Sequence, residues 1–138
     1  MRKRTQSREC ALQVLYQMDI SDGDADESLA RFWEARTDPE SQEVQAYAEK
    51  LVKGTLSKLK EIDLLIERSA ENWEMKRMAY VDRNILRLAT YEMIYLEEIP
   101  VKVAINEAVE LAKRYGEADS SKFVNGILDR ISKTECKK

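Results

Sequence analysis

The chain has 138 residues, of which 43% are hydrophobic and 36% charged, and its formal net charge is -3. This length suits one domain, and the hydrophobic content is too high for a disordered chain. The sequence holds no histidine, no glycine-rich phosphate loop and no apolar run of membrane-spanning length, which excludes histidine-based catalysis, a P-loop and a transmembrane helix.

Apolar residues recur three and four positions apart along most of the chain, and glycine (4) and proline (2), which break helices, are scarce. The sequence therefore predicts an all-α fold of seven helices. These helices are expected over residues 5–19, 25–35, 41–53, a stretch after a joint at Gly54 that runs to about residue 70, 80–96, 102–115, and from Asp119 or Ser120 onward.

The helix over 80–96 carries apolar residues on most of its circumference, which predicts a central, buried position. Gly116 is a suitable C-terminal cap for the following helix, and Asp119 or Ser120 an N-cap for the last one. We expect one domain, residues 1–138, in which the connector near 71–79 separates two packed helical halves, about 1–71 and 72–138.

Cys10 and Cys136 are too few and too far apart in sequence to form a disulfide framework or a zinc site. Without histidine, no general base is available to activate Cys10 as a nucleophile. We therefore expect no enzyme activity, no cofactor and no metal. No apolar segment typical of a signal peptide follows the basic start, so we expect a cytoplasmic protein.

Charge is unevenly distributed along the chain. Residues 1–8 carry four basic side chains and no acid, whereas residues 19–49 carry ten acids against Arg31 and Arg36. A molecule with this asymmetry can attract a polyanion at one end only.

The basic start has a physical case for binding nucleic acid, because arginine and lysine neutralise phosphates. Tyr16, two turns after Arg8 on the predicted helix, offers a ring for base stacking. The residues alone leave two interpretations open: an RNA contact, or a solvated terminus with Tyr16 at the edge of the core.

Two further segments have a functional and a structural interpretation. The start of the last helix, with Lys122 and Phe123, suits a phosphate and a base, or is simply a capped helix with Phe123 in the core. Asp82, Arg83 and Arg87 at the start of the central helix are either a binding surface or a salt-bridged rim.

Several motifs resemble those of one known family, the transcription antitermination factor NusB. The resemblance covers almost the whole chain in order and is specific in its second half. It rests on Arg8-Glu9-Cys10-Ala11, Leu15-Tyr16-Gln17, the segment from Val81 to Glu92, the segment from Ile99 to Gly116, and the segment from Lys122 to Asp129.

The resemblance implies a seven-helix protein of two subdomains that binds boxA, a short single-stranded element of nascent ribosomal RNA. It further implies a heterodimer with NusE, a small-subunit ribosomal protein, within an RNA polymerase antitermination complex that contains other Nus factors. A homodimer of the free protein is a further possibility within the family. The family's RNA contacts carry over to Arg2, Lys3, Arg4, Arg8, Tyr16, Asp119, Lys122 and Phe123, and its NusE contacts to Tyr80, Asp82 and Arg83.

The same sequence features leave two alternative functions open. Some RNA cytosine methyltransferases carry a NusB-like domain, but this chain has no room for the methyl-transferring domain. A protein-interaction module without an RNA role, whose acidic stretch meets a basic partner, is the alternative from a different class.

Overall fold

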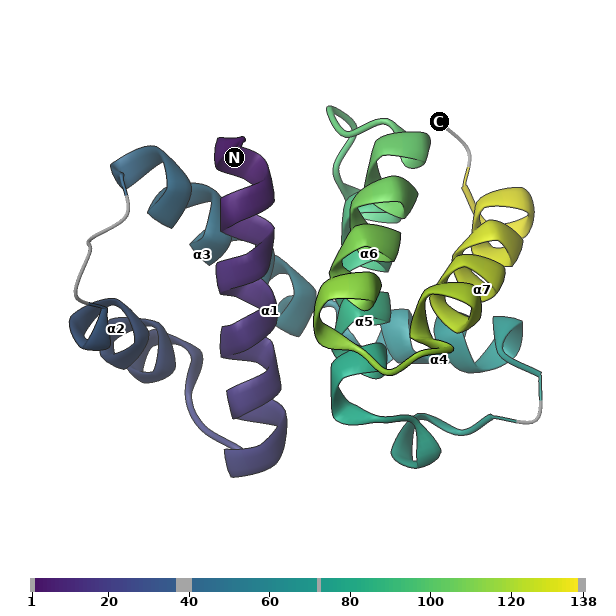
Figure 1. Ribbon diagram of the computed structural model, residues 1–138, viewed down its shortest axis with the longest axis horizontal. Coiled ribbons are helices and arrows are strands. Elements are labelled where there is room, and N and C mark those ends of the chain that lie inside the picture. The colour runs from purple at the N-terminus through teal and green to yellow at the C-terminus, as the bar shows by residue number, and fades with distance from the viewer. Residues whose placement is uncertain (1, 37–40, 72, 137–138) are drawn as a thin grey trace.

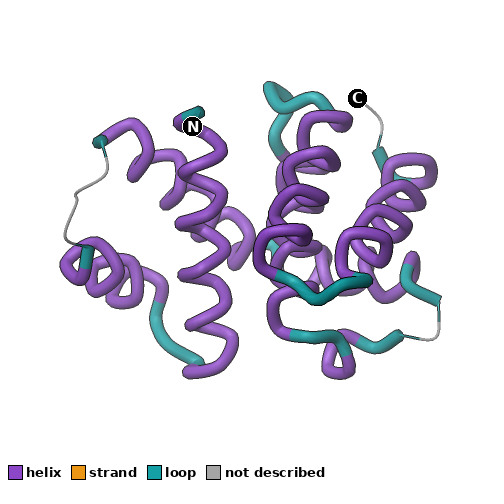
Figure 2. Tube along the Cα trace, in the orientation of Figure 1, coloured by secondary structure: helices purple, strands orange, loops and turns teal. Residues whose placement is uncertain are grey.

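The computed structural model describes residues 2–36, 41–71 and 73–136, and every element of regular secondary structure in these ranges is a helix (Figures 1 and 2). The predicted all-α fold with seven α-helices is confirmed for this part of the chain. The elements are α1 (Lys3–Ser21), α2 (Ala25–Ala35), α3 (Gln42–Ser57), α4 (Leu59–Ser69), a short 3-10 helix η1 (Met75–Arg77), α5 (Tyr80–Tyr95), α6 (Val101–Tyr115) and α7 (Ser120–Thr134).

Helix α5 is the centre of the fold, as its sequence predicts. It packs against α1, α3, α4, α6 and α7, and eight of its residues, on more than one side of the helix, are buried. Ile85 and Leu86, neighbours that point to different sides of the helix, are both fully inaccessible. One contiguous core results, to which every α-helix contributes side chains.

Figure 1 shows α1, α2 and α3 in one half of the molecule and α4 to α7 in the other. Helix α4 packs mainly against α5 and α7 and only lightly against α3. By its packing α4 groups with α5 to α7, and its apolar face, with Ile62 and Ile66, is buried. The division expected near residue 71 stays a prediction.

The predicted helix joint at Gly54 is wrong. Helix α3 continues through Gly54 to Ser57, and the break falls at Lys58, whose backbone leaves the helical region. Gly54 serves packing instead: a Cβ at this position would overlap the hydroxyl end of the Tyr91 side chain on α5. A glycine with no side chain lets α3 and α5 approach closely here.

The caps at the two ends of the α6–α7 link also differ from expectation. Gly116 follows α6 in an extended conformation (φ -95°, ψ -174°), not the left-handed one of a glycine cap. Asp119 precedes α7 but makes no side-chain capping bond; the hydroxyl of Ser120 instead accepts a hydrogen bond from the Glu117 backbone N–H at 2.9 Å. A Cβ on Gly116 would collide with Ser120, so close approach explains the glycine.

We predict that Gly54→Ala lowers the free energy of unfolding by about 1–3 kcal/mol, the usual cost of overpacking a filled core. Gly126→Ala is the matched control, because a Cβ at Gly126 of α7 meets nothing within 4 Å. It should stabilise the protein by about 0.5–1 kcal/mol through helix propensity. Urea denaturation of both variants measures this, and a Gly54→Ala protein at least as stable as wild type would contradict the packing role.

Candidate nucleic-acid interface

A groove runs between α1 and α6, and we call it the α1–α6 groove. Side chains link its two walls at three points: the Thr5 hydroxyl donates to Glu107 at 2.7 Å, Arg8 donates to Glu107 at 2.9 Å, and Arg114 pairs with Glu9. These links fix the separation of the two helices. Two cavities lie along the groove, one at each end of the linked region.

The first cavity, of about 330 Å³, lies at the start of α1. Its α1 wall is basic and its opposite wall is apolar. The basic wall contains the exposed side chains of Arg2, Lys3 and Arg4, and the apolar wall is made of Ile99, Pro100 and Val103. A pocket with cations on one side and hydrocarbon on the other suits a ligand with both a phosphate and a flat apolar group.

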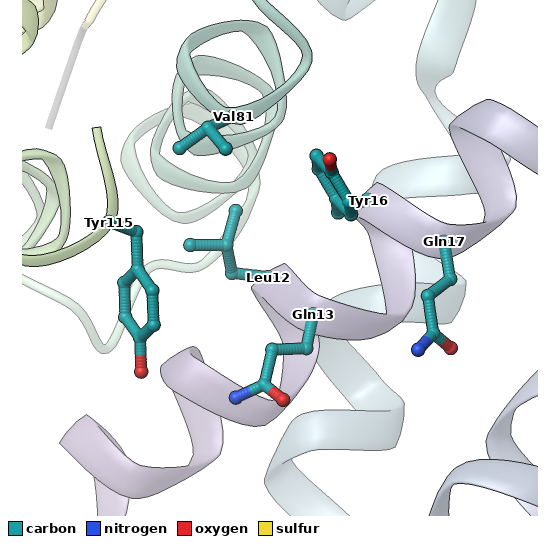
Figure 3. Close-up of a pocket in the computed structure, with 6 residues that line it drawn as sticks. All are labelled: Leu12, Gln13, Tyr16, Gln17, Val81 and Tyr115. Atoms are coloured by element: carbon teal, nitrogen blue, oxygen red, sulfur yellow. The ribbon is translucent and has the colours of Figure 1, made fainter. Parts of the chain in front are cut away.

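The second cavity, of about 310 Å³, lies further along α1, where that helix faces the start of α5 and the end of α6. Figure 3 shows Tyr16 and Tyr115 on either side of Leu12, with Val81 behind and Gln13 and Gln17 at the rim. Both tyrosine rings are over one third exposed. Partial burial and the neighbouring Glu9 raise the pKa of Tyr115, which keeps its hydroxyl protonated as a donor.

Arg8 lines the first cavity together with Glu107. Its side chain is 4% exposed, and its Nε donates to both carboxylate oxygens of Glu92 on α5, at 2.9 and 3.0 Å. The Tyr47 hydroxyl of α3 donates to the same carboxylate at 2.5 Å. Burial acts to lower the pKa of Arg8, but the hydrogen bond and charge of Glu92 outweigh it and raise that pKa.

The family resemblance implies a direct RNA contact at Arg8, and this stays a prediction. In the structure the guanidinium is largely buried and donates to two carboxylates. Sequence reasoning did not predict this burial. A signal was present: Arg8 precedes Leu12 and Leu15 by one and two turns and so lies on the buried stripe of α1. The partners Glu92 and Tyr47 are far apart in sequence and were not predicted.

The other predicted basic residues lie at the surface. Lys3 pairs with Glu43 at 2.8 Å, and both side chains are exposed, so this pair is weak and screened by salt. The Arg4 guanidinium lies 4.7 Å from the ring centre of Tyr47, which orients Arg4 without neutralising it. The structure thus brings Arg2, Lys3 and Arg4 together at one end of the groove.

The start of α7 adds a cation and an aromatic ring. Lys122 and Asp119 are exposed, and Phe123 is half-buried. The ring of Phe123 packs edge to face with Trp73, with centroids 5.6 Å apart. Sequence reasoning placed Trp73 in a connector without a role, and it missed Tyr115 as a cavity wall, because both positions depend on contacts between elements distant in sequence.

The three residues expected to bind NusE surround the start of α5. Tyr80 is 45% exposed and lies under the Arg83 guanidinium at 4.4 Å. Arg83 itself is largely covered, because it forms a two-pronged ion pair with Asp19 of α1 at 2.6 and 2.8 Å. Burial alone would raise the pKa of Asp19, but hydrogen bonds from Arg83 and Asn84 hold that pKa below its ordinary value.

Asp82 lies in the first turn of α5, where its charge complements the helix dipole. One of its carboxylate oxygens, Oδ1, is covered and has no hydrogen-bond partner. A covered carboxylate oxygen without a donor is costly, and a partner that supplies one would gain from it.

Among the described residues, no group of three or more metal-ligating side chains comes together. In the same ranges, no helix combines the length and the apolar character needed to cross a bilayer.

Fold and groove together define an all-helical protein that presents cations and aromatic rings along one surface, as nucleic-acid-binding modules do. A sequence model described as the NusB family matches residues 5–133. The chain belongs to the NusB family.

Relatives and solved structures agree with this assignment. A transcription antitermination protein NusB from Anaeromyxobacter sp. is 49% identical over 130 residues, which is 94% of this chain and 90% of the relative. The corresponding protein of Bacillus licheniformis is 47% identical, over 94% of this chain and 95% of its own length.

Two solved structures are similar over nearly the whole chain. T. maritima NusB superposes with a TM-score of 0.86 at 39% identity and covers 97% of this chain and 93% of its own. A crystal structure of the antitermination factors NusB and NusE in complex with double-stranded RNA has a TM-score of 0.87 at 33% identity, over 96% and 98% of the two chains. The predicted family and fold are confirmed.

We predict that Arg8→Met lowers the free energy of unfolding by about 3–5 kcal/mol, because it leaves the buried Glu92 carboxylate without its cation. Lys53→Met is the control, since it removes a cation from the exposed pair with Asp26 and should cost less than about 1 kcal/mol. Urea denaturation at neutral pH compares them. Equal stability of the two variants would show that the buried pair does not hold the helices together.

Proposed function

We propose that this chain is a transcription antitermination factor that binds boxA-type single-stranded RNA of nascent ribosomal transcripts together with NusE. It acts within an RNA polymerase complex that contains other Nus factors. The observation that carries the proposal is the α1–α6 groove, which has exposed cations at one end and an aromatic cavity at the other. The names of the relatives and the solved NusB–NusE–RNA complex support it.

In this proposal the cations and the rings have separate tasks. Arg2, Lys3, Arg4 and Lys122 neutralise phosphates, which gives affinity without sequence preference. Tyr16 and Phe123 stack on unpaired bases, as aromatic side chains do in proteins that bind single strands.

Two further residues take roles that follow from their chemistry. Asp119, exposed beside Lys122, cannot bind a phosphate, but its carboxylate can accept a hydrogen bond from the amino group of a base. Arg8 positions α1 against α5 and thereby holds Arg4 on Tyr47 and fixes the groove, in addition to the RNA contact that the resemblance implies for it.

The NusE surface is proposed at the start of α5, with Tyr80 and Asp82 as direct contacts. Arg83 holds Tyr80 and Asp19 in place and reaches the partner with the remaining face of its guanidinium. The chain acts by binding and not by catalysis. This follows from the absence of histidine in the sequence and from a groove whose described polar groups pair with one another instead of forming a nucleophile and base.

We predict that replacing Arg2, Lys3 and Arg4 together by Ala weakens binding of a boxA-type RNA and lowers the slope of log affinity against log salt by about 2, since each phosphate contact on a single strand contributes about 0.7. Fluorescence anisotropy from low to moderate salt measures both quantities.

The control removes three lysines of α3, α4 and their junction, Lys53, Lys58 and Lys60, and so changes the net charge equally. Its affinity should fall much less, and its slope should stay near that of wild type. If the two triple variants behave alike, the basic start has no specific role.

We predict that Asp82→Lys weakens NusE binding at least tenfold, because a lysine ammonium repels the donor that the covered carboxylate oxygen would otherwise accept from. The fold should lose no more than about 1 kcal/mol, the size of a helix-end charge effect. Calorimetric titration with NusE tests this, with Asp22→Lys, an exposed acid at the end of α1, as the matched control. Normal affinity of the Asp82 variant would remove this surface from the interface.

A further inference from the structure

Trp73 is one of two tryptophans in the chain, and its environment is unusual for that residue. Its side chain is 49% exposed, although a tryptophan in a soluble protein is ordinarily mostly buried. Trp33, by contrast, is half-buried and packs against the core, and its indole N–H donates to Glu49 at 3.2 Å. Tryptophan combines a large apolar face with a polar N–H and is enriched at interfaces, so an exposed indole beside a second ring is a candidate binding surface.

The surroundings of Trp73 point to one kind of ligand. The indole lies against Phe123 at an interplanar angle of 72°, so the two rings meet edge to face and not face to face. In an edge-to-face pair, the edge of one ring covers a face of the other ring, and only that second ring has a covered face. Lys122, next to Phe123 in the first turn of α7, is exposed and supplies a positive charge one residue from that ring.

Aromatic faces beside a cation match the repeating unit of a single-stranded nucleic acid, in which flat bases alternate with phosphates. Acidic side chains flank the indole in the chain, at Glu71 and Glu74, and Glu74 pairs with Lys76 at 3.5 Å. A phosphate path therefore fits the Lys122 side of the ring and not the connector side.

We propose that Trp73 stacks on an unpaired base of the bound RNA, so that the RNA surface extends from α7 onto the connector between α4 and α5. This inference rests on the proposed RNA-binding function and adds to it a residue, and one more nucleotide, that the sequence motifs do not include. The competing role for Trp73 is purely structural: it would clamp the connector to α7 through Phe123.

The experiment uses the full-length chain with Trp33→Phe, which leaves Trp73 as the only tryptophan fluorophore. The probe is a boxA-type single-stranded RNA, and a set of the same RNA with one abasic nucleotide at each position in turn. We expect the Trp73 emission to be quenched on titration with the intact RNA, since stacking brings a base onto the indole.

Trp73→Leu keeps an apolar side chain against Phe123 but removes the large aromatic face, and it should bind the RNA about fivefold or more weakly, the lower end of the range for one base–aromatic stack. Trp73→Tyr should recover part of this loss. Leu64→Ala, which shortens an exposed apolar side chain on α4, is the control and should bind normally.

The decisive measurement is a double-mutant cycle. If Trp73 stacks on one base, one abasic position should weaken binding to the Trp33→Phe protein but have no effect in the protein that also carries Trp73→Leu. A lowered melting temperature of the Trp73→Leu protein with unchanged RNA affinity would establish the clamp role and overturn the proposal.

Different outcomes would refute the RNA-binding function and the stacking role of Trp73. If the Trp33→Phe protein binds no RNA, alone or with NusE, the proposed function fails and this inference fails with it. If that protein binds RNA, but with unchanged emission and no coupling at any abasic position, only the role of Trp73 is refuted.

Discussion

The buried ion pair between Arg8 and Glu92 is the constraint on which the arrangement of the helices depends. It joins α1 to α5 at the centre of the fold, and Tyr47 from α3 and Glu107 from α6 complete its hydrogen bonds. Burying two charges costs several kcal/mol per ion unless geometry and hydrogen bonding compensate. Here four helices supply the compensation, because Tyr47 and Glu107 satisfy groups that the Arg8–Glu92 pair alone would leave unpaired. Removal of one member of the pair would leave a buried charge without its partner.

The candidate RNA surface is a consequence of this placement. Glu107 receives a bond from Thr5 as well as Arg8, so α6 is held alongside α1 and a groove remains between them. Tyr47, fixed by Glu92, provides the ring on which Arg4 lies. The buried ion pair of Arg8 and Glu92 therefore orders the exposed guanidinium of Arg4. Arg8 thus supports Arg4, one of the proposed phosphate contacts, through Glu92 and Tyr47.

What the sequence could predict depends on the distance over which each signal acts. Helix periodicity is local, so the helices were located to within a few residues and α5 was correctly placed at the centre. Gly54 was misassigned because its role comes from Tyr91, 37 residues away in the chain and on another helix. The burial of Arg8 was missed for the same reason, since its charge was judged without Glu92. Tyr115 and Trp73 became candidates only when the fold brought them beside Tyr16 and Phe123.

The proposed RNA and NusE surfaces are adjacent parts of one structure. Tyr16, at the wall of the aromatic cavity, packs edge to face against Tyr80 at 6.3 Å, and Tyr80 lies beneath Arg83. Arg83 in turn is tied to Asp19, which is three residues after Tyr16 on α1 and also bonds Asn84 and Arg87. Helix α1 thus contributes to both surfaces, and a short series of packed rings and ion pairs connects the RNA surface to the NusE surface. A side chain in this series cannot change position without affecting both surfaces. Substitutions there therefore need binding measurements for RNA and for NusE together.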